Sequence, residues 1–475
     1  MTTAVVVGSG PNGLAAALTL AAEGVRVRVI EAADTLGGGI RSSELTLPGL
    51  VHDECSGFHP LALGSAFAER FDLAGAGLTW RWAPAEMAHP LQDGRGAVLH
   101  RSVTRTAEGL GSAGKSWSRV FGPLTDRFDT ISQEFLRPVL HLPRHPVHLA
   151  RFGLFSGLPA TVLARRFGTP EGQALFAGVA AHAFRPLNTV ASSAIGVALT
   201  TAAHAYGWPV AEGGSVAIRD AILARAAEYG VEFETGRRVT SLGELGKLGE
   251  RGQVDVVMLD TSPSAAARIV GDQMPGRVRR AYTAYRHGPG AFKVDFAVEG
   301  GVPWTHEGSR TAGTVHLGGT LGEIEAAEKL VCSGRMPAQP FVLVGQQYVA
   351  DRTRSAGDVH PLYAYAHVPA GYTGDATEAI IRRIEQFAPG FRDRIRATYV
   401  RSTTEMSTHN ENYVGGDIVT GANDPLQLVF RPRAAINPYS TGVPGVYLCS
   451  AATPPGAGAH GMCGYNAALG ALARL

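Results

Sequence analysis

Three closely spaced glycines near the N-terminus are the residues whose spacing most clearly predicts chemistry. Gly8, Gly10 and Gly13 follow a short apolar run, and Glu31 ends a second apolar run about twenty residues later. A glycine turn brings backbone N–H groups against an anionic group such as a phosphate, and a helix that begins there adds further free N–H groups. A carboxylate such as Glu31 accepts hydrogen bonds from a ribose diol. The pattern therefore indicates recognition of a ligand that contains phosphate and ribose.

The elements around these glycines match the unit that such recognition needs. Residues 4–7 predict a strand, 14–23 a helix of small residues and 25–30 a second strand. We expect Gly8 to make the tight turn, Gly10 to let the backbone approach a pyrophosphate and Gly13 to let the helix pack on the strand. Glycine-rich chains produce such motifs by chance, but here every contextual condition is met. The sequence thus predicts an α/β fold that begins with a Rossmann-type dinucleotide-binding domain.

The segment that follows narrows the ligand. Residues 31–42, EAADTLGGGIRS, resemble the E-A-x-D-x-x-G-G-x-x-x-S/T segment of FAD enzymes in the amine oxidase and phytoene desaturase superfamily, of the glutathione reductase 2 (GR2) type. Many relatives have arginine directly after the glycine pair, where this chain has Gly39, and we expect Arg41 to supply that charge instead. The resemblance implies non-covalently bound FAD, contacted by Gly8, Gly10, Pro11, Asn12, Gly13, Glu31, Ala32, Gly38, Gly39, Arg41 and Ser42.

Three later segments extend the resemblance to nearly the whole chain. Residues 51–60 correspond to a segment that runs beside the flavin ring, which implies that Ser56, Gly57, Phe58 and His59 lie near the isoalloxazine. Residues 207–242 imply that Val239 contacts adenine through its backbone. Residues 445–466 imply a strand and a final helix whose N-terminus faces the flavin pyrimidine, with contacts from Ser450, Ala451, Gly461 and Met462. The similarity is greatest to the branch of pyridine nucleotide-disulfide oxidoreductase domain 2-like proteins.

Two residues are candidates for catalysis. Lys293, one of only four lysines, lies in the apolar segment 290–298 and is followed by Trp304. That segment resembles the amine oxidase strand in which a lysine holds a water at flavin N5; a lysine at a strand end in water is the alternative. His59 is the second candidate, and the alternative is a loop histidine that caps a helix beginning near Leu61. No catalytic triad and no metal-ligand spacing is readable, so we expect no metal.

Length and pattern predict a division into interleaved parts. A chain of 475 residues is too long for one core. We expect a discontinuous FAD-binding domain at 1–65, 207–275 and 410–475, a mainly helical cap at 66–206 and an antiparallel-sheet substrate domain at 276–409. The cap and the substrate domain together form an α+β substrate region that is interleaved with the FAD-binding domain. Within the FAD-binding domain, strands are expected at 231–233, 237–242 and 254–260. His182, in the cap, could point at substrate, although a core histidine is the favoured interpretation.

Composition bounds the partners and the location. The net charge of +2 gives no electrostatic case for nucleic acid, and the four cysteines form no C-x-x-C pair, which argues against disulfide-reductase chemistry. The N-terminus lacks a signal-peptide pattern. Residues 143–167 are basic and amphipathic and could lie on a membrane, but a helical lid is favoured because prolines and glycines interrupt any long face. A cytoplasmic protein is expected, with peripheral contact to a membrane as the alternative, and its oligomeric state is not predicted.

The resemblance implies an FAD-dependent oxidoreductase that moves a hydride from a C–H bond of a small apolar organic substrate to flavin N5. Oxygen or a quinone would accept the electrons. Three alternatives remain open at this point: a redox-neutral double-bond isomerase that uses flavin, an amine oxidase, and a non-catalytic, flavin-bearing interaction protein.

Overall fold

The N-terminal strand lies at the centre of a five-stranded parallel sheet. The structure is a computed structural model that describes residues 2–246 and 254–475. Every pairing in this sheet is parallel, which confirms the Rossmann-type arrangement predicted from the glycine motif. The strand order is β16 (Val446–Leu448), β10 (Val256–Leu259), β1 (Thr3–Val7), β2 (Arg26–Ile30) and β9 (Glu232–Glu234).

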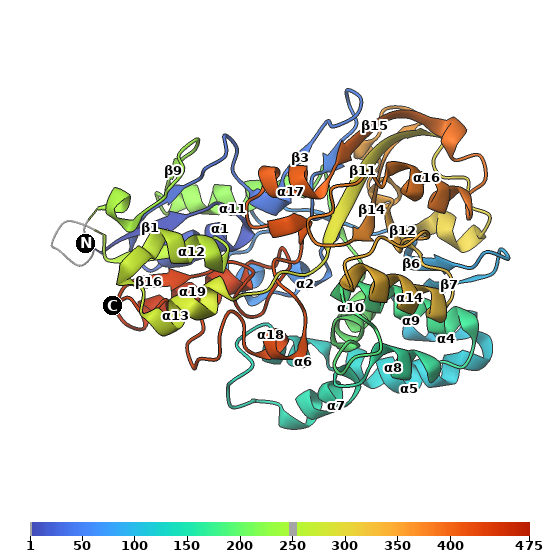
Figure 1. Ribbon diagram of the computed structural model, residues 1–475, viewed down its shortest axis with the longest axis horizontal. Helices are drawn as coiled ribbons and strands as arrows, with labels where there is room; N and C mark the ends of the chain where they lie inside the picture. Colours follow the sequence, from blue (N-terminus) through green and yellow to red (C-terminus); the bar gives the residue numbers. More distant parts are fainter. Residues whose placement is uncertain (1, 247–253) are drawn as a thin grey trace.

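Helices cover both faces of this sheet, as a parallel sheet with buried apolar strands requires. On one face Val6 packs against three helices: α1 (Pro11–Ala22), α11 (Val216–Glu228) and α19 (Met462–Leu472). On the other face Val7 packs against α12 (Pro263–Val270) and α13 (Gly276–Thr283). Segments from the start, middle and end of the chain therefore form one three-layered unit, with both termini at its outer end (Figure 1).

A second sheet of seven strands forms the other half of the molecule (Figure 1). Its order is β15 (Ile395–Arg401), β11 (Gly290–Glu299), β14 (Val359–Val368), β13 (Val342–Gly345), β12 (Ala312–Leu317), β6 (Ala85–Pro90) and β7 (Gly96–Leu99). Pairings among the first five strands are antiparallel, as predicted for residues 280–400. The sheet is mixed because β6 joins β12 in parallel.

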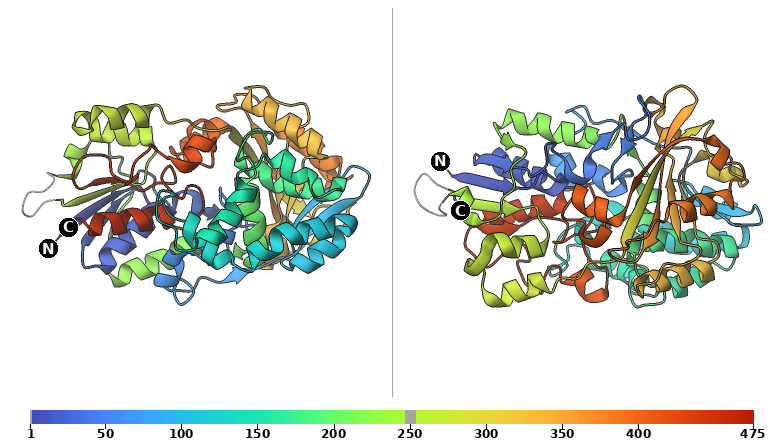
Figure 2. Two further views of the ribbon diagram at one scale, coloured as in Figure 1. Left: turned by 90° about the horizontal axis from the view of Figure 1, so that it is seen from below. Right: turned by 45° about the horizontal axis from the view of Figure 1, so that its top comes forward.

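Side chains alternate across β11 and so divide the two faces of this sheet. Phe292, Val294 and Phe296 pack on α16 (Thr377–Glu385), whereas Lys293 and Asp295 point to the opposite face. The helices between residues 103 and 205 cover that opposite face (Figure 1 and Figure 2). They are α4 (Val103–Gly109), α5 (Gly114–Thr125), α6 (Phe128–Phe135), α7 (Pro146–Ser156), α8 (Ala160–Arg165), α9 (Pro170–Ala180) and α10 (Ala194–Ala205).

The remaining elements are short, apart from α14 (Leu321–Cys332), which packs on α9 beside the second sheet. The short ones are β3 (Ser42–Ser43), β4 (His52–Asp53), α2 (Pro60–Leu63), α3 (Ala66–Arg70), β5 (Trp80–Arg81), β8 (Val210–Ala211), α15 (Gln347–Ala350), α17 (Thr403–His409) and α18 (Pro425–Val429). Across the described ranges, none of the helices is both long and apolar enough to cross a bilayer.

One predicted strand is wrong. Residues 237–242 form no strand; instead a 3-10 turn spans Leu242–Leu245. The turn begins with a capping box in which Ser241 and Glu244 bond each other's backbone N–H groups. Arg237 is drawn back to Glu234 by an ion pair at 3.0 Å. These local side-chain bonds compete with a sheet ladder, and apolar content alone did not reveal them.

Candidate functional site

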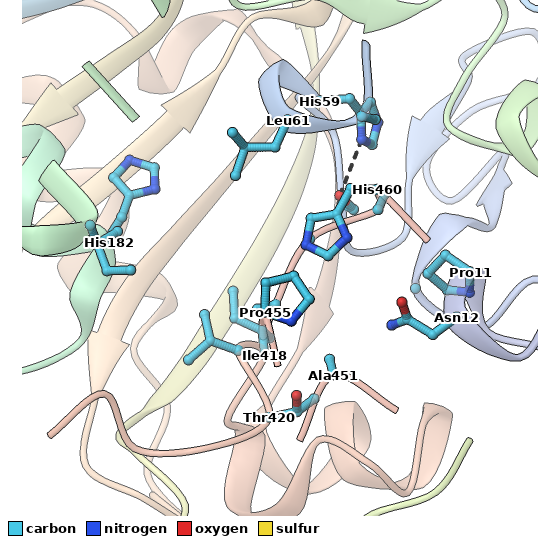
Figure 3. Close-up of a pocket in the computed structure, with 18 of the residues that line it drawn as sticks. Pro11, Asn12, His59, Leu61, His182, Ile418, Thr420, Ala451, Pro455 and His460 are labelled. Carbon is cyan, nitrogen blue, oxygen red and sulfur yellow. Dashed lines mark hydrogen bonds between the residues drawn. The ribbon is translucent and has the colours of Figure 1, made fainter. Parts of the chain in front are cut away.

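One cavity of about 460 Å³ joins the glycine turn to the seven-stranded sheet. At one end it is lined by residues of the parallel unit, among them Gly10, Asn12 and Ala451. At the other end Phe152, Leu199, Tyr363 and other apolar or aromatic side chains of the helical layer and second sheet surround it. Figure 3 shows Pro11, Asn12 and His460 at the first end, His182 at the second, and Leu61 and Ile418 between them.

The glycine turn has the close packing that the spacing predicts. Gly8 has φ +98°, which a β-carbon would strain, and a side chain on Gly13 would collide with the carbonyl oxygen of Gly8. Gly10, Pro11 and Asn12 line the cavity at the start of α1. The side-chain oxygen of Asn12 is buried without a hydrogen-bond partner in the described chain. An unpaired polar atom beside a glycine cradle fits a polar ligand group.

Asp260, which the sequence interpretation missed, occupies this cradle. It follows β10, and its Oδ2 accepts a hydrogen bond from the N–H of Gly13 at 3.0 Å. A β-carbon at Gly10 would lie 2.6 Å from the same oxygen. Burial raises the pKa of Asp260 to about 7; the N–H groups of Gly13 and Gly10 oppose this rise and the negative Glu31 contributes to it. The sequence contained a signal for this residue: Asp260 ends a predicted strand, and the carboxyl ends of neighbouring parallel strands meet at one edge of a sheet.

Glu31 holds the first turn together. Its Oε2 accepts from the backbone and hydroxyl of Ser9 at 2.8 and 2.7 Å, and its Oε1 accepts from the N–H of Ala33 at 2.9 Å. Ala32 lies between these two anchors. The carboxylate thus stands at the end of β2 beside the glycine turn, where the motif predicts it. The expected ribose contact stays a prediction.

The second glycine cluster packs directly on the first. A β-carbon at Gly38 would lie 2.9 Å from the Cα of Gly10, and Gly39 lines the cavity beneath the hydroxyl of Tyr413. Arg41, expected to supply a charge to the ligand, does not line the cavity. Its guanidinium donates to the carbonyls of Gly38 at 3.0 Å and His409 at 2.9 Å, so these bonds direct it away.

Ser42 is likewise engaged by protein. Its hydroxyl donates to Asp53 at 2.8 Å and accepts from the N–H of Val216 at 3.1 Å. Val239 is buried against Ile30 in the core of the parallel unit and does not line the cavity. Neither position contradicts the implied FAD contacts, and both contacts stay predictions.

Ser56, Gly57, Phe58 and His59 all line the middle of the cavity. The hydroxyl of Ser215 donates to the carbonyl of Ser56 and so accepts from His59 Nε2, at 2.9 Å. Burial lowers the pKa of His59 to about 4, so the ring is neutral. His59 is the N-cap residue of the short helix α2, where the alternative interpretation places it, although its side chain makes no capping bond. Its catalytic role stays a prediction.

The C-terminal segment closes the cofactor end. Ser450 and Ala451 line the cavity after β16, and Gly461, with φ +70°, starts α19 against Phe67 and Ala15. Gly461 and Met462 are not among the lining residues. The N–H of Met462 donates to His460 Nδ1 at 3.1 Å, so one free donor of the helix is already paired. His460 itself lines the cavity and was not predicted; no motif marks it.

Lys293 lies on the predicted strand but behind the cavity wall. It is buried, pairs with Asp295, and stands 5.1 Å over the ring of Tyr363, which does line the cavity. His52 Nδ1 approaches the other oxygen of Asp295 at 3.4 Å. The alternative of a solvated strand-end lysine is therefore wrong. The structure does not bring Lys293 together with His59 at the cavity surface, and its role toward flavin stays a prediction.

The far end of the cavity is apolar apart from a few polar groups. Phe152 of α7 lines it, which supports the lid interpretation of residues 143–167, while Val147 and Leu154 of the same helix are exposed. His182 lines this end, contrary to the favoured interpretation as a core histidine. Arg431, also missed, is buried at the cavity wall with only neutral oxygens as partners: those of Gln427, Asn423 and Ala451.

Negative charge is scarce at the cavity surface, which two arginines, Arg137 and Arg431, also line. Of the lining residues that the structure describes, Asp260 alone carries a carboxylate, and it lies at the glycine turn. A search of residues 2–246 and 254–475 gives no group of three or more His, Cys, Asp or Glu side chains that could hold a metal ion. The four cysteines are free thiols.

Comparison with known proteins agrees with this architecture. Residues 6–69 match the NAD(P)-binding Rossmann-like domain family. The chain is 26% identical to a phytoene dehydrogenase of Streptomyces griseus, over 96% of this chain and 91% of that protein. It is 24% identical to the rat pyridine nucleotide-disulfide oxidoreductase domain-containing protein 2, over 98% and 92%. A putrescine oxidase solved with putrescine superposes with a TM-score of 0.62 at 16% identity, over 100% and 99% of the two chains.

The chain is similar over most of its length to proteins named phytoene dehydrogenase and pyridine nucleotide-disulfide oxidoreductase domain-containing protein 2, and its fold is that of a putrescine oxidase. These similarities agree with the resemblance to the amine oxidase and phytoene desaturase superfamily seen in the sequence.

Proposed function

We propose that the protein binds FAD non-covalently and oxidises a carbon-rich, largely apolar substrate. The observation that carries the proposal is the continuity of one cavity from the glycine turn, past Ser56–Phe58, to an apolar chamber. A hydride acceptor must lie against both the dinucleotide site and the substrate, and this arrangement offers a single space for the two.

The residues at the cofactor end suit FAD. The backbone N–H groups at the start of α1, together with Gly38 and Gly39, would hold the diphosphate. Bound FAD would supply an acceptor for two electrons and a proton. Arg431 and the N-terminus of α19 place positive potential near Ala451, which would favour the negative charge of a reduced flavin.

The substrate end suits a molecule with little charge. Its walls are mostly apolar and aromatic, and they exclude water from the reacting C–H bond. Leu61, Ile418 and Leu199 would orient the substrate by contact alone. His59 is neutral and fixed by Ser215, so it can position a group or accept a hydrogen bond through Nδ1 but carries no charge.

Purified protein tests the proposal directly. It should be yellow, and denaturation should release FAD. A panel of apolar alcohols, enones and polyenes should then contain compounds that bleach the flavin anaerobically. Colourless protein that cannot be reconstituted with FAD would end the proposal.

The described chain contains one complete strand–glycine–helix–strand–acid unit, which supports an electron acceptor other than a nicotinamide. Oxygen or a quinone is proposed. Rapid anaerobic bleaching of the flavin by micromolar NADPH would contradict this part.

Two other activities are separated by simple assays. An amine oxidase would bind a protonated amine, yet the chamber offers no carboxylate to offset the charge, since Asp260 lies at the glycine turn. Turnover of putrescine or cyclohexylamine would therefore be an unexpected result. A redox-neutral isomerase would work only after the flavin is reduced and would consume no acceptor.

A further inference from the structure

Two histidines at the apolar end of the cavity form a bonded pair. His182 lies in the 3-10 turn Ala181–Ala183 and lines the cavity, while His316 lies on β12 and is fully buried. Their Nε2 atoms are 2.9 Å apart. A hydrogen bond between two imidazole nitrogens needs a proton on one and a lone pair on the other, so the pair fixes the tautomer of both rings.

The surroundings of His316 decide which ring donates. Its Nδ1 is buried without a partner in the described chain, and a β-carbon on Gly178 would lie 3.0 Å from it. The neighbouring ring of His89 shows the same arrangement. Its Nε2 donates to the carbonyl of Gly319 at 2.8 Å, and its Nδ1 is likewise buried without a partner in the described chain. Buried N–H groups without an acceptor are rarer than buried acceptors without a donor. His316 therefore carries its proton on Nε2 and donates it to His182.

This assignment leaves the proton of His182 on Nδ1. That nitrogen has no hydrogen-bond partner among the described residues, and the side chain faces the cavity (Figure 3). Burial, together with the nearby His367, lowers the pKa of His182 to about 3, so the ring is neutral. The apolar chamber thus contains a fixed, uncharged N–H donor.

The backbone that holds His182 is unusual. Phe184, which ends the same turn and also lines the cavity, adopts a left-handed conformation with φ 50°. A bulky side chain rarely takes this conformation, and such strain concentrates at ligand sites. The strained turn directs both His182 and Phe184 into one part of the chamber.

We propose that His182 Nδ1 binds a neutral oxygen, of a carbonyl or hydroxyl group, at one end of an otherwise apolar substrate. The inference rests on the proposed function and narrows its substrate class. A neutral donor suits a neutral acceptor, since it cannot offset the charge of a carboxylate and offers nothing to an ammonium group. In an apolar chamber the bond also favours an oxygen-bearing molecule over the corresponding hydrocarbon, which leaves the donor unpaired.

A matched pair of probes tests the bond. Octan-2-one and 2-methyloct-1-ene differ mainly by an oxygen in place of a methylene, and binding to the FAD-loaded protein can be followed through the flavin spectrum. In His182→Phe the ketone should bind about five- to tenfold more weakly, the equivalent of one hydrogen bond, while the alkene changes less than about twofold. Equal losses for both probes, or no loss for the ketone, would overturn the inference.

A control variant separates burial from contact. His204 is also a buried, neutral histidine, bonded to Trp117 and outside the cavity lining. His204→Phe should leave the binding of both probes unchanged. FAD content is measured first on every variant, because it distinguishes a failure of the proposed function from a failure of this inference. A protein without FAD contradicts the proposed function, whereas FAD-loaded protein without a ketone preference contradicts only this inference.

The tautomer provides a second test that needs no ligand. In ¹⁵N-histidine-labelled holoprotein, the ring signals that vanish in His182→Gln identify His182. Their pattern should be that of a neutral ring protonated at Nδ1 between pH 6 and 8. A ring protonated at Nε2, or one that titrates in this range, would overturn the inference.

Discussion

Two sets of buried carboxylates in this molecule have opposite surroundings. At the junction of the two halves, Asp53 bonds Arg354 at 2.6 Å and Asp295 pairs with Lys293. Burial alone would raise the pKa of each, but the adjacent cations hold the pKa values of Asp53 and Asp295 below the usual range. At the glycine turn Asp260 has only backbone donors, and burial raises its pKa to about 7.

This difference in pKa distinguishes carboxylates with a structural role from a carboxylate that can respond to a ligand. A buried ion pair contributes little net stability but becomes costly when one partner is removed. An unpaired carboxylate whose pKa lies near neutrality can change its charge when an anionic ligand arrives. The carboxylates at the junction are therefore paired structural charges, whereas Asp260 lines the cavity at the glycine turn without a cationic partner among the described residues. Four experiments test this division.

The largest effect is expected for Arg354→Met. Asp53 would stay buried with an uncompensated charge, and the free energy of unfolding should fall by about 3–5 kcal/mol. Denaturant titration measures it. A loss below about 1 kcal/mol would mean that Ser42 and Ser215, which also bond Asp53, suffice without the cation.

Lys293→Met should destabilise by a smaller amount, on the order of 2–3 kcal/mol, because His52 remains as a partner of Asp295. Lys293→Met/Asp295→Leu, which removes both charges, should recover most of this loss. Flavin half-reactions measured by stopped flow then isolate chemistry from folding. A deficit of about a hundredfold in one half-reaction of the stable double variant would assign Lys293 a role at flavin after all.

Asp260→Asn should change the pH dependence of FAD binding. Because an ionised Asp260 repels the diphosphate, FAD affinity of the wild type should fall by up to about tenfold between pH 6 and pH 8, through the pKa near 7. The asparagine variant should bind FAD with a flat profile over that range. Parallel profiles for the two proteins would remove Asp260 from the phosphate site.

The last prediction concerns stability without FAD. A carboxyl whose pKa is raised on folding contributes stability that is complete below its unfolded value near 4 and is lost as pH rises through about 7. The stability difference between wild type and Asp260→Asn should therefore shift in favour of the wild type as pH falls from 8 to 5. Comparing the two proteins cancels the buried histidines, whose lowered pKa values act in the opposite direction.

The glycine turn could be predicted well because all the residues that define it lie within about forty positions of one another in the sequence. Gly8, Gly13 and Glu31 take the places that the motif requires. Asp260 lies 247 residues from its partner Gly13, and only the pairing of β1 with β10 brings them together. The strand that carries Lys293 was predicted, but Asp295 was overlooked even though residues two apart on a strand share a face. Arg41 donates to the carbonyl of His409 on a distant helix, a bond that the local motif does not reveal, and its contact with the ligand stays a prediction.

The distant origin of β10 and β16 also sets the order in which the protein can be completed during synthesis. A ribosome makes about 5–20 residues per second, so β1 and β2 emerge long before β10 and β16 can join them. Helix α19 packs on α1 only when the last residues are free. Until then the apolar edge of β1 must be kept covered, so we expect chaperones to bind this half of the nascent chain. We also expect the cofactor to bind only after the chain has left the ribosome.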